Sequence, residues 1–166
     1  MRRFTVCFGS LAEMPSWLFA RLVSSSFYLS HDIRRDVVLS LVFLEEGLAI
    51  RLVGGKLRHV HVDEQSLSGI YRKAVSAMER GARRRVHWGI YVSEAKRELK
   101  ASGYRVVTGK GCSGSLEVPQ PHTFYFSCGH GREEVCLSPR QRPVDAAIAV
   151  LNVALDRQEQ GRRPLP

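Results

Sequence analysis

The sequence predicts a single α/β domain whose strands alternate with helices and pair mostly in parallel. Three observations carry this prediction. Short apolar runs rich in Val, Leu, Ile and Phe recur along the chain, segments with helical apolar spacing separate them, and Gly, Pro, Ser or Asp turn signals mark the boundaries. The length of 166 residues suits one domain with a substantial core. We place the domain at residues 1–156 and expect residues 157–166 to form a flexible tail.

The first half of the chain is expected to contribute three strands and two helices. Pro15 stands where a first helix should begin, and Asp63 stands where a second should be capped. Each is followed by apolar residues at helical spacing. The expected elements are, in order, a strand at 4–8, a helix from Pro15, strands at 37–44 and 48–53, and a helix from Asp63 to Gly81.

The second half alternates more regularly. Ser93 is the expected cap of a helix that Gly103 closes, and residues 144–156 have the apolar face of a packed helix. Extended pieces complete the pattern at 89–92, 104–108, 123–126 and 135–137.

The carboxyl ends of parallel strands are the expected place for a ligand. Loops 108–114, 127–131 and 137–142 follow three predicted strands, and their glycines would let backbone amides approach a small molecule. Plain turns would have the same composition. No G-x-G-x-x-G opens a helix and no G-x-x-x-x-G-K-[ST] occurs, which disfavours a dinucleotide or nucleoside-triphosphate site.

Basic charge is concentrated in one segment of the chain. The net charge is +9, and residues 72–110 hold eleven basic and three acidic side chains, so this segment carries +8 of it. A charge this localised indicates a polyanionic partner, with nucleic acid ahead of membrane. A solvated basic face would show the same pattern.

The cysteines, the apolar stretches and the N-terminus indicate which other classes of protein this chain does not resemble. Cys7, Cys112, Cys128 and Cys136 have no C-x-x-C spacing, so we expect no metal site, and a disulfide framework is unnecessary at this length. No apolar stretch reaches the roughly 18 residues that a membrane span needs. The first strand follows the N-terminus without a signal-type apolar region, so we expect a cytoplasmic protein without a membrane partner.

The most unusual stretch is residues 30–38, where Asp32, Arg34, Arg35 and Asp36 stand directly before a buried apolar run. Burying such charges costs several kcal/mol each unless they are paired. The stretch is therefore either a self-neutralising cluster at an exposed strand end or a set of groups that face a polar site. Chemistry alone favours the first interpretation.

A resemblance favours the second. Residues 27–37, F-Y-L-S-H-D-I-R-R-D-V, closely resemble the signature of the archaeal tRNA pseudouridine-54 N1-methyltransferase family (TrmY), within the SPOUT superfamily. Further similar blocks follow in order at 53–57 with Asp63-Glu64, at 89–92, and at 136–139 with the helix that ends at Asp156. The chain departs from the family at 128–130, where Cys-Gly-His replaces the usual Gly-Asp-His, and in the short connection 132–134.

The resemblance implies an α/β fold with a deep C-terminal trefoil knot. It also implies a homodimer with sites shared between subunits, and S-adenosyl-L-methionine as cofactor. The residues that it assigns to the cofactor are Thr108, Ser127, Cys128, Gly129, Leu137, Ser138, Pro139 and Arg140.

The implied reaction is methylation of N1 of pseudouridine at position 54 of tRNA, which requires that nitrogen to lose its proton. Asp32 or Asp36 could accept the proton, and Arg34 or Arg35 could stabilise negative charge or hold a phosphate. We predict that Asp32 and Arg35 are catalytic, with Asp36 and Arg34 pairing structurally.

The basic segment is expected to follow RNA phosphates, giving affinity without sequence choice. The residues assigned to RNA are Arg34, Arg83, Arg84, Arg85 and Lys96, with Arg72 and Lys73 in support. Trp88 could stack on a base, or it could be a core or interface residue. Two alternatives stay open: a methyltransferase of the same superfamily that acts on another RNA position, and a catalytically silent RNA-binding dimer.

Overall fold

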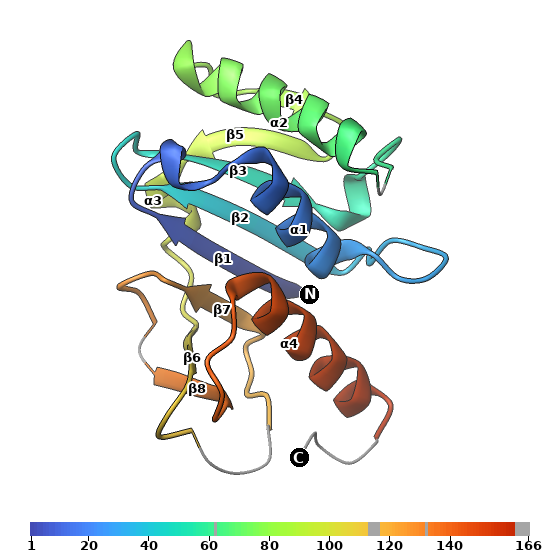
Figure 1. The fold of residues 1–166 in the computed structure, drawn as a ribbon, viewed down its shortest axis with the longest axis vertical. Helices are drawn as coiled ribbons and strands as arrows, with labels where there is room; N and C mark the ends of the chain where they lie inside the picture. Colours follow the sequence, from blue (N-terminus) through green and yellow to red (C-terminus); the bar gives the residue numbers. More distant parts are fainter. Residues whose placement is uncertain (62, 113–116, 132, 162–166) are drawn as a thin grey trace.

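The computed structural model describes residues 1–61, 63–112, 117–131 and 133–161. These residues form one mixed eight-stranded sheet with helices against it (Figure 1). The strands are β1 (Arg2–Phe8), β2 (Val37–Phe43), β3 (Leu48–Val53), β4 (Arg85–His87), β5 (Ile90–Glu94), β6 (Tyr104–Thr108), β7 (Thr123–Phe126) and β8 (Glu133–Ser138). The helices are α1 (Ser16–Phe27), α2 (Glu64–Glu79), α3 (Ala95–Glu98) and α4 (Val144–Glu159), with short 3₁₀ turns η1 (Leu11–Glu13) and η2 (Gly54–Lys56).

The sheet has a parallel half and an antiparallel half, in the order β4-β5-β3-β2-β1-β7-β6-β8. β1 lies at the centre and pairs in parallel with β2 and β7, and β6 pairs in parallel with β7 and β8. β2–β3, β3–β5 and β4–β5 are antiparallel. The expectation of a largely parallel sheet therefore holds on the β8 side, while two tight turns, 44–47 and 88–89, reverse the chain on the β4 side.

The two faces of the sheet are covered unequally. α1, α2 and α4 pack on one face over the main core, whose largest buried side chains include Phe4, Phe19, Phe27 and Phe124. The other face holds a smaller cluster around Val42 and Tyr125, beside α3. Every residue of β2 is buried, as expected for a central strand with cover on both faces.

Local signals placed most helices correctly. Asp63 caps α2, accepting a hydrogen bond from the Ser66 amide at 2.7 Å. The helix expected between Ser93 and Gly103 is instead the single turn α3, because Ser93 continues β5. The carboxylate of Glu98 anchors that turn to the sheet by accepting hydrogen bonds from the hydroxyls of Ser40 at 2.8 Å and Ser93 at 3.0 Å.

Two disulfides are present that the sequence analysis considered unnecessary. Cys7 bonds to Cys128 and Cys112 bonds to Cys136. The first pair joins the carboxyl end of β1 to the loop after the neighbouring strand β7, and the second joins the turn after β6 to β8. The sequence spacing of the cysteines does not predict these pairs, because the order of the strands in the sheet brings them together.

The C-terminal helix is longer than predicted. α4 runs to Glu159 rather than Asp156, and the Glu159 carboxylate lies 2.9 Å from the guanidinium of buried Arg2. Residues 162–166 of the predicted tail lie outside the described residues. Within the described part of the chain, no helix is both long and apolar enough to span a membrane.

Candidate active site

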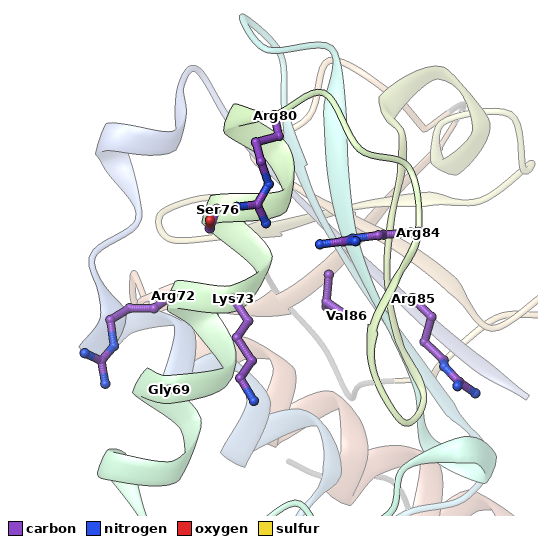
Figure 2. A pocket seen from close by; sticks show the side chains of 8 residues that line it. All are labelled: Gly69, Arg72, Lys73, Ser76, Arg80, Arg84, Arg85 and Val86. Atoms are coloured by element: carbon purple, nitrogen blue, oxygen red, sulfur yellow. The ribbon is translucent and has the colours of Figure 1, made fainter.

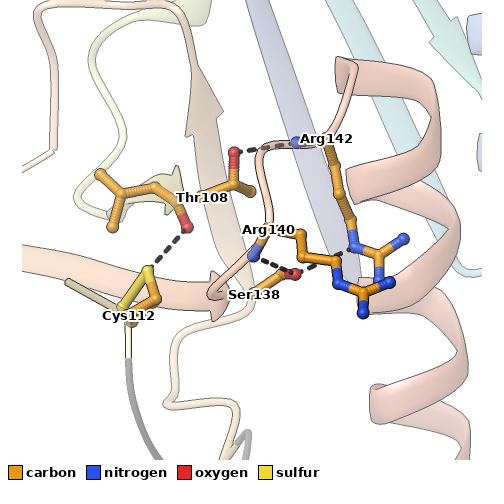
Figure 3. Close-up of a disulfide and its surroundings, with 7 residues drawn as sticks. Thr108, Cys112, Ser138, Arg140 and Arg142 are labelled. Atoms are coloured by element: carbon orange, nitrogen blue, oxygen red, sulfur yellow. Dashed lines mark hydrogen bonds between the residues drawn. A yellow bond between two sulfur atoms is a disulfide. The ribbon is translucent and has the colours of Figure 1, made fainter. Parts of the chain in front are cut away.

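The ends of β6 and β8 carry a cluster of hydroxyl and guanidinium groups (Figure 3). The Ser138 hydroxyl accepts hydrogen bonds from the Arg140 amide at 3.2 Å and from Nε of Arg142 at 3.1 Å. The Thr108 hydroxyl accepts one from the Arg142 amide at 3.3 Å, and the Gly109 amide donates to the Ser138 carbonyl at 2.8 Å. The turn 138–142 is therefore fastened to the end of β6.

The predicted cofactor residues gather at this edge of the sheet. Leu137 and Ser138 are buried, and Pro139 and Arg140 are exposed beside them. The other predicted group, 127–129, follows β7, the next strand across the sheet from β6. The β6–β7 ladder stops at Arg105–Tyr125, so the carboxyl ends of these two strands are not paired with each other.

The loop after β7 has an unusual backbone. Ser127 has a φ of 56°, a left-handed conformation that non-glycine residues rarely adopt and that clusters at functional sites. The Cys128 side chain is buried in its disulfide with Cys7, so only its backbone can face a ligand. At Gly129 an added Cβ would meet no heavy atom within 4 Å, and the same holds at Gly109 and Gly111.

This donor set suits S-adenosyl-L-methionine, which combines a carboxylate, a ribose and a base. Glycine backbone with open space beside it admits a ligand closely, hydroxyls can bond ribose or base, and guanidinium groups bind carboxylates. Among the described residues, no group of three or more His, Cys, Asp and Glu side chains could hold a metal ion.

The charged stretch 30–36 divides into a solvent-facing pair and a paired set. Asp32 and Arg35 are exposed, with Arg35 Nη2 3.7 Å from Asp32 Oδ1. Arg35 also donates to the Leu57 carbonyl at 3.1 Å, and Asp32 Oδ1 accepts from the Ile33 amide at 2.7 Å. These contacts hold both side chains at the start of β2 while leaving them accessible.

Arg34 and Asp36 belong to an ionic network, as their predicted structural pairing requires. Arg34 binds Asp156 through both terminal nitrogens, at 2.7 and 2.6 Å. Arg2, only 2% exposed, lies between Asp36 at 3.1 Å, Asp156 at 2.7 Å and Glu159 at 2.9 Å. Nε of Arg2 is near Asp36 without the alignment of a hydrogen bond. The assignment of Arg34 to RNA stays a prediction.

The network sets the protonation of its central acid. Burial alone would raise the pKa of Asp156, but hydrogen bonds and positive charge from Arg34 and Arg2 outweigh it and lower that pKa below its ordinary value. The Asn152 side chain extends the network: it accepts a hydrogen bond from Arg2 at 3.1 Å and donates one to the Ser25 carbonyl at 2.9 Å. The network thereby fixes the start of β2 to β1 and α4.

Tyr28 lies next to the charged stretch and is a hydrogen-bond donor rather than a base. Its hydroxyl donates to the His61 carbonyl at 3.0 Å. Burial, with a smaller contribution from the Asp63 charge, raises the pKa of Tyr28 to about 12.

Within one chain the two predicted halves of the site lie at opposite edges of the sheet. The register pairs Arg2 with Val37, so residues 30–36 stand at the amino ends of the parallel strands. Ser138 pairs with Thr108 at the carboxyl ends. The length of β1 separates the two edges, about 20 Å at 3.3 Å per residue. One chain therefore does not bring Asp32 and Arg35 to the cofactor residues.

The residues assigned to RNA differ in their availability. Arg83 and Lys96 both pair with Glu94, Lys96 at 3.0 Å. Arg84 and Arg85 are exposed, and the Arg85 guanidinium lies 4.5 Å from the centre of the Trp88 ring. Trp88 is 54% exposed, so the interpretation of it as a core residue is wrong.

Sequence reasoning missed two participants. Arg142 was not assigned, although it stands in an Arg-rich turn between two prolines, which could have identified it. Arg2 is a second, and no local signal marks it, because its three acidic partners come from positions far along the chain.

The fold is that of an α/β protein with a basic face and with a candidate small-molecule site at the carboxyl ends of β6 to β8. Residues 14–102 match the model of a family described as "Putative SAM-dependent RNA methyltransferase". Because this match covers more than half of the chain, the chain belongs to that family.

Curated relatives carry a more specific name. A tRNA (pseudouridine(54)-N(1))-methyltransferase of Methanococcus maripaludis is 29% identical over 167 aligned positions, covering 84% of each chain. The enzyme of that name from Haloferax volcanii is 42% identical over 62 positions, 37% of this chain and 31% of the relative. That from Methanocaldococcus jannaschii is 38% identical over 84 positions, 45% and 41% respectively.

Proposed function

We propose that this protein transfers a methyl group from S-adenosyl-L-methionine to N1 of pseudouridine at position 54 of a tRNA. The observation that carries the proposal is the alignment to a relative of that name over 84% of both chains, joined to the family match. A tRNA substrate would place the reaction in the cytoplasm.

The cofactor residues would be those at the ends of β6, β7 and β8. Backbone at Ser127 and Gly129 would bind through amides and carbonyls, while Arg140 and Arg142 supply positive charge for a carboxylate. When bound, the sulfonium group supplies an electrophilic methyl. The Thr108–Ser138 pair at the ends of β6 and β8 would position it.

Asp32 and Arg35 would act on the nucleobase. N1 of pseudouridine carries a proton because the sugar is attached through carbon. Asp32, 67% exposed, would accept that proton directly or through a water. Arg35, held by the Leu57 carbonyl, would stabilise the negative charge that develops on the ring.

A second copy of the chain would complete the site. Because Asp32 lies at the edge opposite Ser138, the partner subunit would present its charged stretch to this subunit's cofactor loops. We also propose that the C-terminal segment is threaded as a trefoil knot. Its support is that both ends of that segment contact the chain between β6 and β7: Arg142 donates to Thr108 at the end of β6, and Gln158 donates to the Val118 carbonyl in the connection at 3.2 Å.

The test is mass analysis of tRNA after incubation with the protein and S-adenosyl-L-methionine. We expect one added methyl at position 54 when that position is pseudouridine and none when it is uridine. Equal methylation of both transcripts would indicate the alternative, an enzyme for another position or base. Calorimetry tests the silent RNA-binding alternative, because that protein would give no binding heat with the cofactor.

A further inference from the structure

A basic hollow of about 640 Å³ lies between α2 and β4 (Figure 2). α2 contributes Arg72, Lys73 and Arg80, and the segment entering β4 contributes Arg84 and Arg85. None of the described residues that line it is acidic. In Figure 2, Lys73, Arg80 and Arg84 extend toward the space between α2 and β4, whereas Arg72 extends from the other side of α2 and Arg85 points away from that space.

The cations of the hollow are unpaired, in contrast to those elsewhere. Within the described part of the chain, Arg72, Lys73, Arg80 and Arg84 form no salt bridge, whereas Arg83 and Lys96 share Glu94. Concentrating unpaired positive charges around one opening costs free energy through repulsion, which a bound polyanion would relieve. The positive charge of residues 72–110 therefore falls into two groups. One group pairs with a carboxylate of the protein, and the other is available to a ligand.

The spacing along α2 fits a chain of phosphates better than a single anion. One face of α2 carries positions 69, 72, 73, 76 and 80. The small residues Gly69 and Ser76 leave space on this face between the cationic side chains. Arg72 and Arg80 are about 12 Å apart along the helix axis at 1.5 Å per residue. That length is several times the roughly 3.4 Å axial spacing of successive phosphates in one strand of a DNA duplex, so this helix face can contact more than one phosphate.

A series of contacts leads from the hollow to the charged stretch. Arg85 lies against the exposed ring of Trp88. Gly89, next in sequence, packs so tightly on the backbone of η2 and its following residue that an added Cβ would be 2.6 Å from the Leu57 amide nitrogen. The Leu57 carbonyl in turn accepts the hydrogen bond from Arg35. Trp88 is thus held at the same edge of the sheet as Asp32 and Arg35.

We propose that the hollow between α2 and β4 binds the sugar–phosphate backbone of the RNA substrate, and that Trp88 stacks on a base between the hollow and the charged stretch. The identity of the partner as RNA rests on the proposed function. Arg72, Lys73, Arg80 and Arg84 carry the phosphate contacts, and Arg83 and Lys96 contribute less because the Glu94 carboxylate they share offsets half of their combined charge.

The test compares tRNA affinity across salt concentrations for two triple variants, using a transcript with pseudouridine at position 54. The hollow variant is Arg72→Ala, Lys73→Ala and Arg80→Ala. The matched control is Lys96→Ala, Arg97→Ala and Lys100→Ala, which removes the same charge from exposed positions around α3. The hollow variant should make the slope of log K against log salt shallower by about 2 to 3, and the control by less than about 1.

Equal slopes for the two triple variants would overturn the proposal, since the effect would then be one of overall charge. Trp88→Ala should weaken binding about 5- to 100-fold without changing the slope, and Trp88→Phe should restore most of it. Unchanged affinity in Trp88→Ala would remove the stacking part.

The outcome is separable from that of the proposed function. These measurements need no methyl transfer, so a protein that binds through the hollow but leaves pseudouridine unmodified would refute only the reaction. Conversely, a hollow variant with wild-type affinity and salt slope that still methylates the tRNA would refute only the proposed RNA binding in the hollow. Calorimetry with S-adenosyl-L-methionine should give wild-type affinity in both triple variants, because neither touches the cofactor loops.

Discussion

At the scale of single residues, burial separates the charges that hold the fold from those that can do chemistry. Arg2 and Arg34 share Asp156 and are held among carboxylates, whereas Asp32 and Arg35 face water in the same short region. Breaking the first group leaves buried charge uncompensated, but removing an exposed charge of the second costs little stability.

The pH dependence of stability should report on Asp156. Asp156→Asn should lower the free energy of unfolding by about 2 to 3 kcal/mol near neutral pH, since it removes charged hydrogen bonds to Arg34 and Arg2. The folded-state pKa of Asp156 is lowered from its ordinary value of 3.8. The wild type's advantage is therefore complete above about pH 5 and declines as the pH falls through 3.8 towards the lowered pKa.

Urea unfolding between pH 2.5 and 7 measures this difference. Asp32→Asn is the control, because an exposed carboxylate should change stability by less than about 0.5 kcal/mol. A constant difference between wild type and Asp156→Asn across the whole range would contradict the assignment.

A single glycine tests the cofactor site. Gly129→Leu places its Cβ where no heavy atom lies within 4 Å, so the fold should tolerate it. If the cofactor uses that space, the variant should give no binding heat with S-adenosyl-L-methionine while its melting temperature stays at the wild-type value. Gly47→Ala serves as a control far from these loops; its φ of 64° costs stability but leaves cofactor binding intact.

At the scale of elements, the disulfides fix the loops that the cofactor would use. Cys112–Cys136 ties the turn after β6 to β8, and Cys7–Cys128 ties the loop after β7 to β1. Disulfides of this kind persist in oxidising compartments and in the intracellular proteins of hyperthermophiles. If the protein is cytoplasmic, as the sequence suggests, its disulfides are therefore of the kind found in hyperthermophiles.

Removing the two bridges should have different consequences. The Cys7–Cys128 bridge spans 121 residues and Cys112–Cys136 spans 24. Chain entropy predicts losses of about 5 and about 3 kcal/mol respectively for the paired Cys→Ser variants. The second variant should also weaken cofactor binding, because it frees the turn after Thr108. Thermal melts and calorimetry of both variants test this, and equal cofactor affinity in the second variant would exclude a role for that bridge in the site.

At the scale of the whole molecule, the parallel half of the sheet puts the charged stretch and the cofactor loops at opposite edges. The proposed site would therefore need a second chain, which the proposed dimer would supply. Dimers of identical subunits offer two equivalent sites by symmetry.

Mixing two inactive variants tests this arrangement. Asp32→Asn should reduce methyl transfer by about 10²- to 10⁴-fold through loss of the base, and Gly129→Leu should abolish cofactor binding. After unfolding and refolding together, random pairing should restore activity to about a quarter of the wild-type value, because half of the dimers hold one intact site. No recovery, with exchange verified by a tag on one variant, would show that each chain builds its own site.

Local signals account for much of the fold. Asp63 caps α2, the apolar run after Asp36 forms β2, and the helical spacing after Pro143 forms α4. The prediction of a longer helix between Ser93 and Gly103 was wrong. Serines on strands β2 and β5 anchor Glu98, and helix propensity cannot reveal these contacts. Resemblance predicted a catalytic role for Asp32 and Arg35, and this stays a prediction, whereas Arg142 became a candidate only through its hydrogen bonds at the end of β8.

The sequence by itself determined the alternation of strands and helices, the concentration of positive charge in residues 72–110, and the resemblance to a methyltransferase family, because periodicity, composition and motif are local properties. Only the tertiary structure decided which charges are free. Among the residues that the structure describes, Arg34 and Arg83 pair with carboxylates while Arg72 and Arg84 do not, and the cysteines bond across neighbouring elements. The reason is that pairing depends on strand order and register, which bring together residues more than a hundred positions apart.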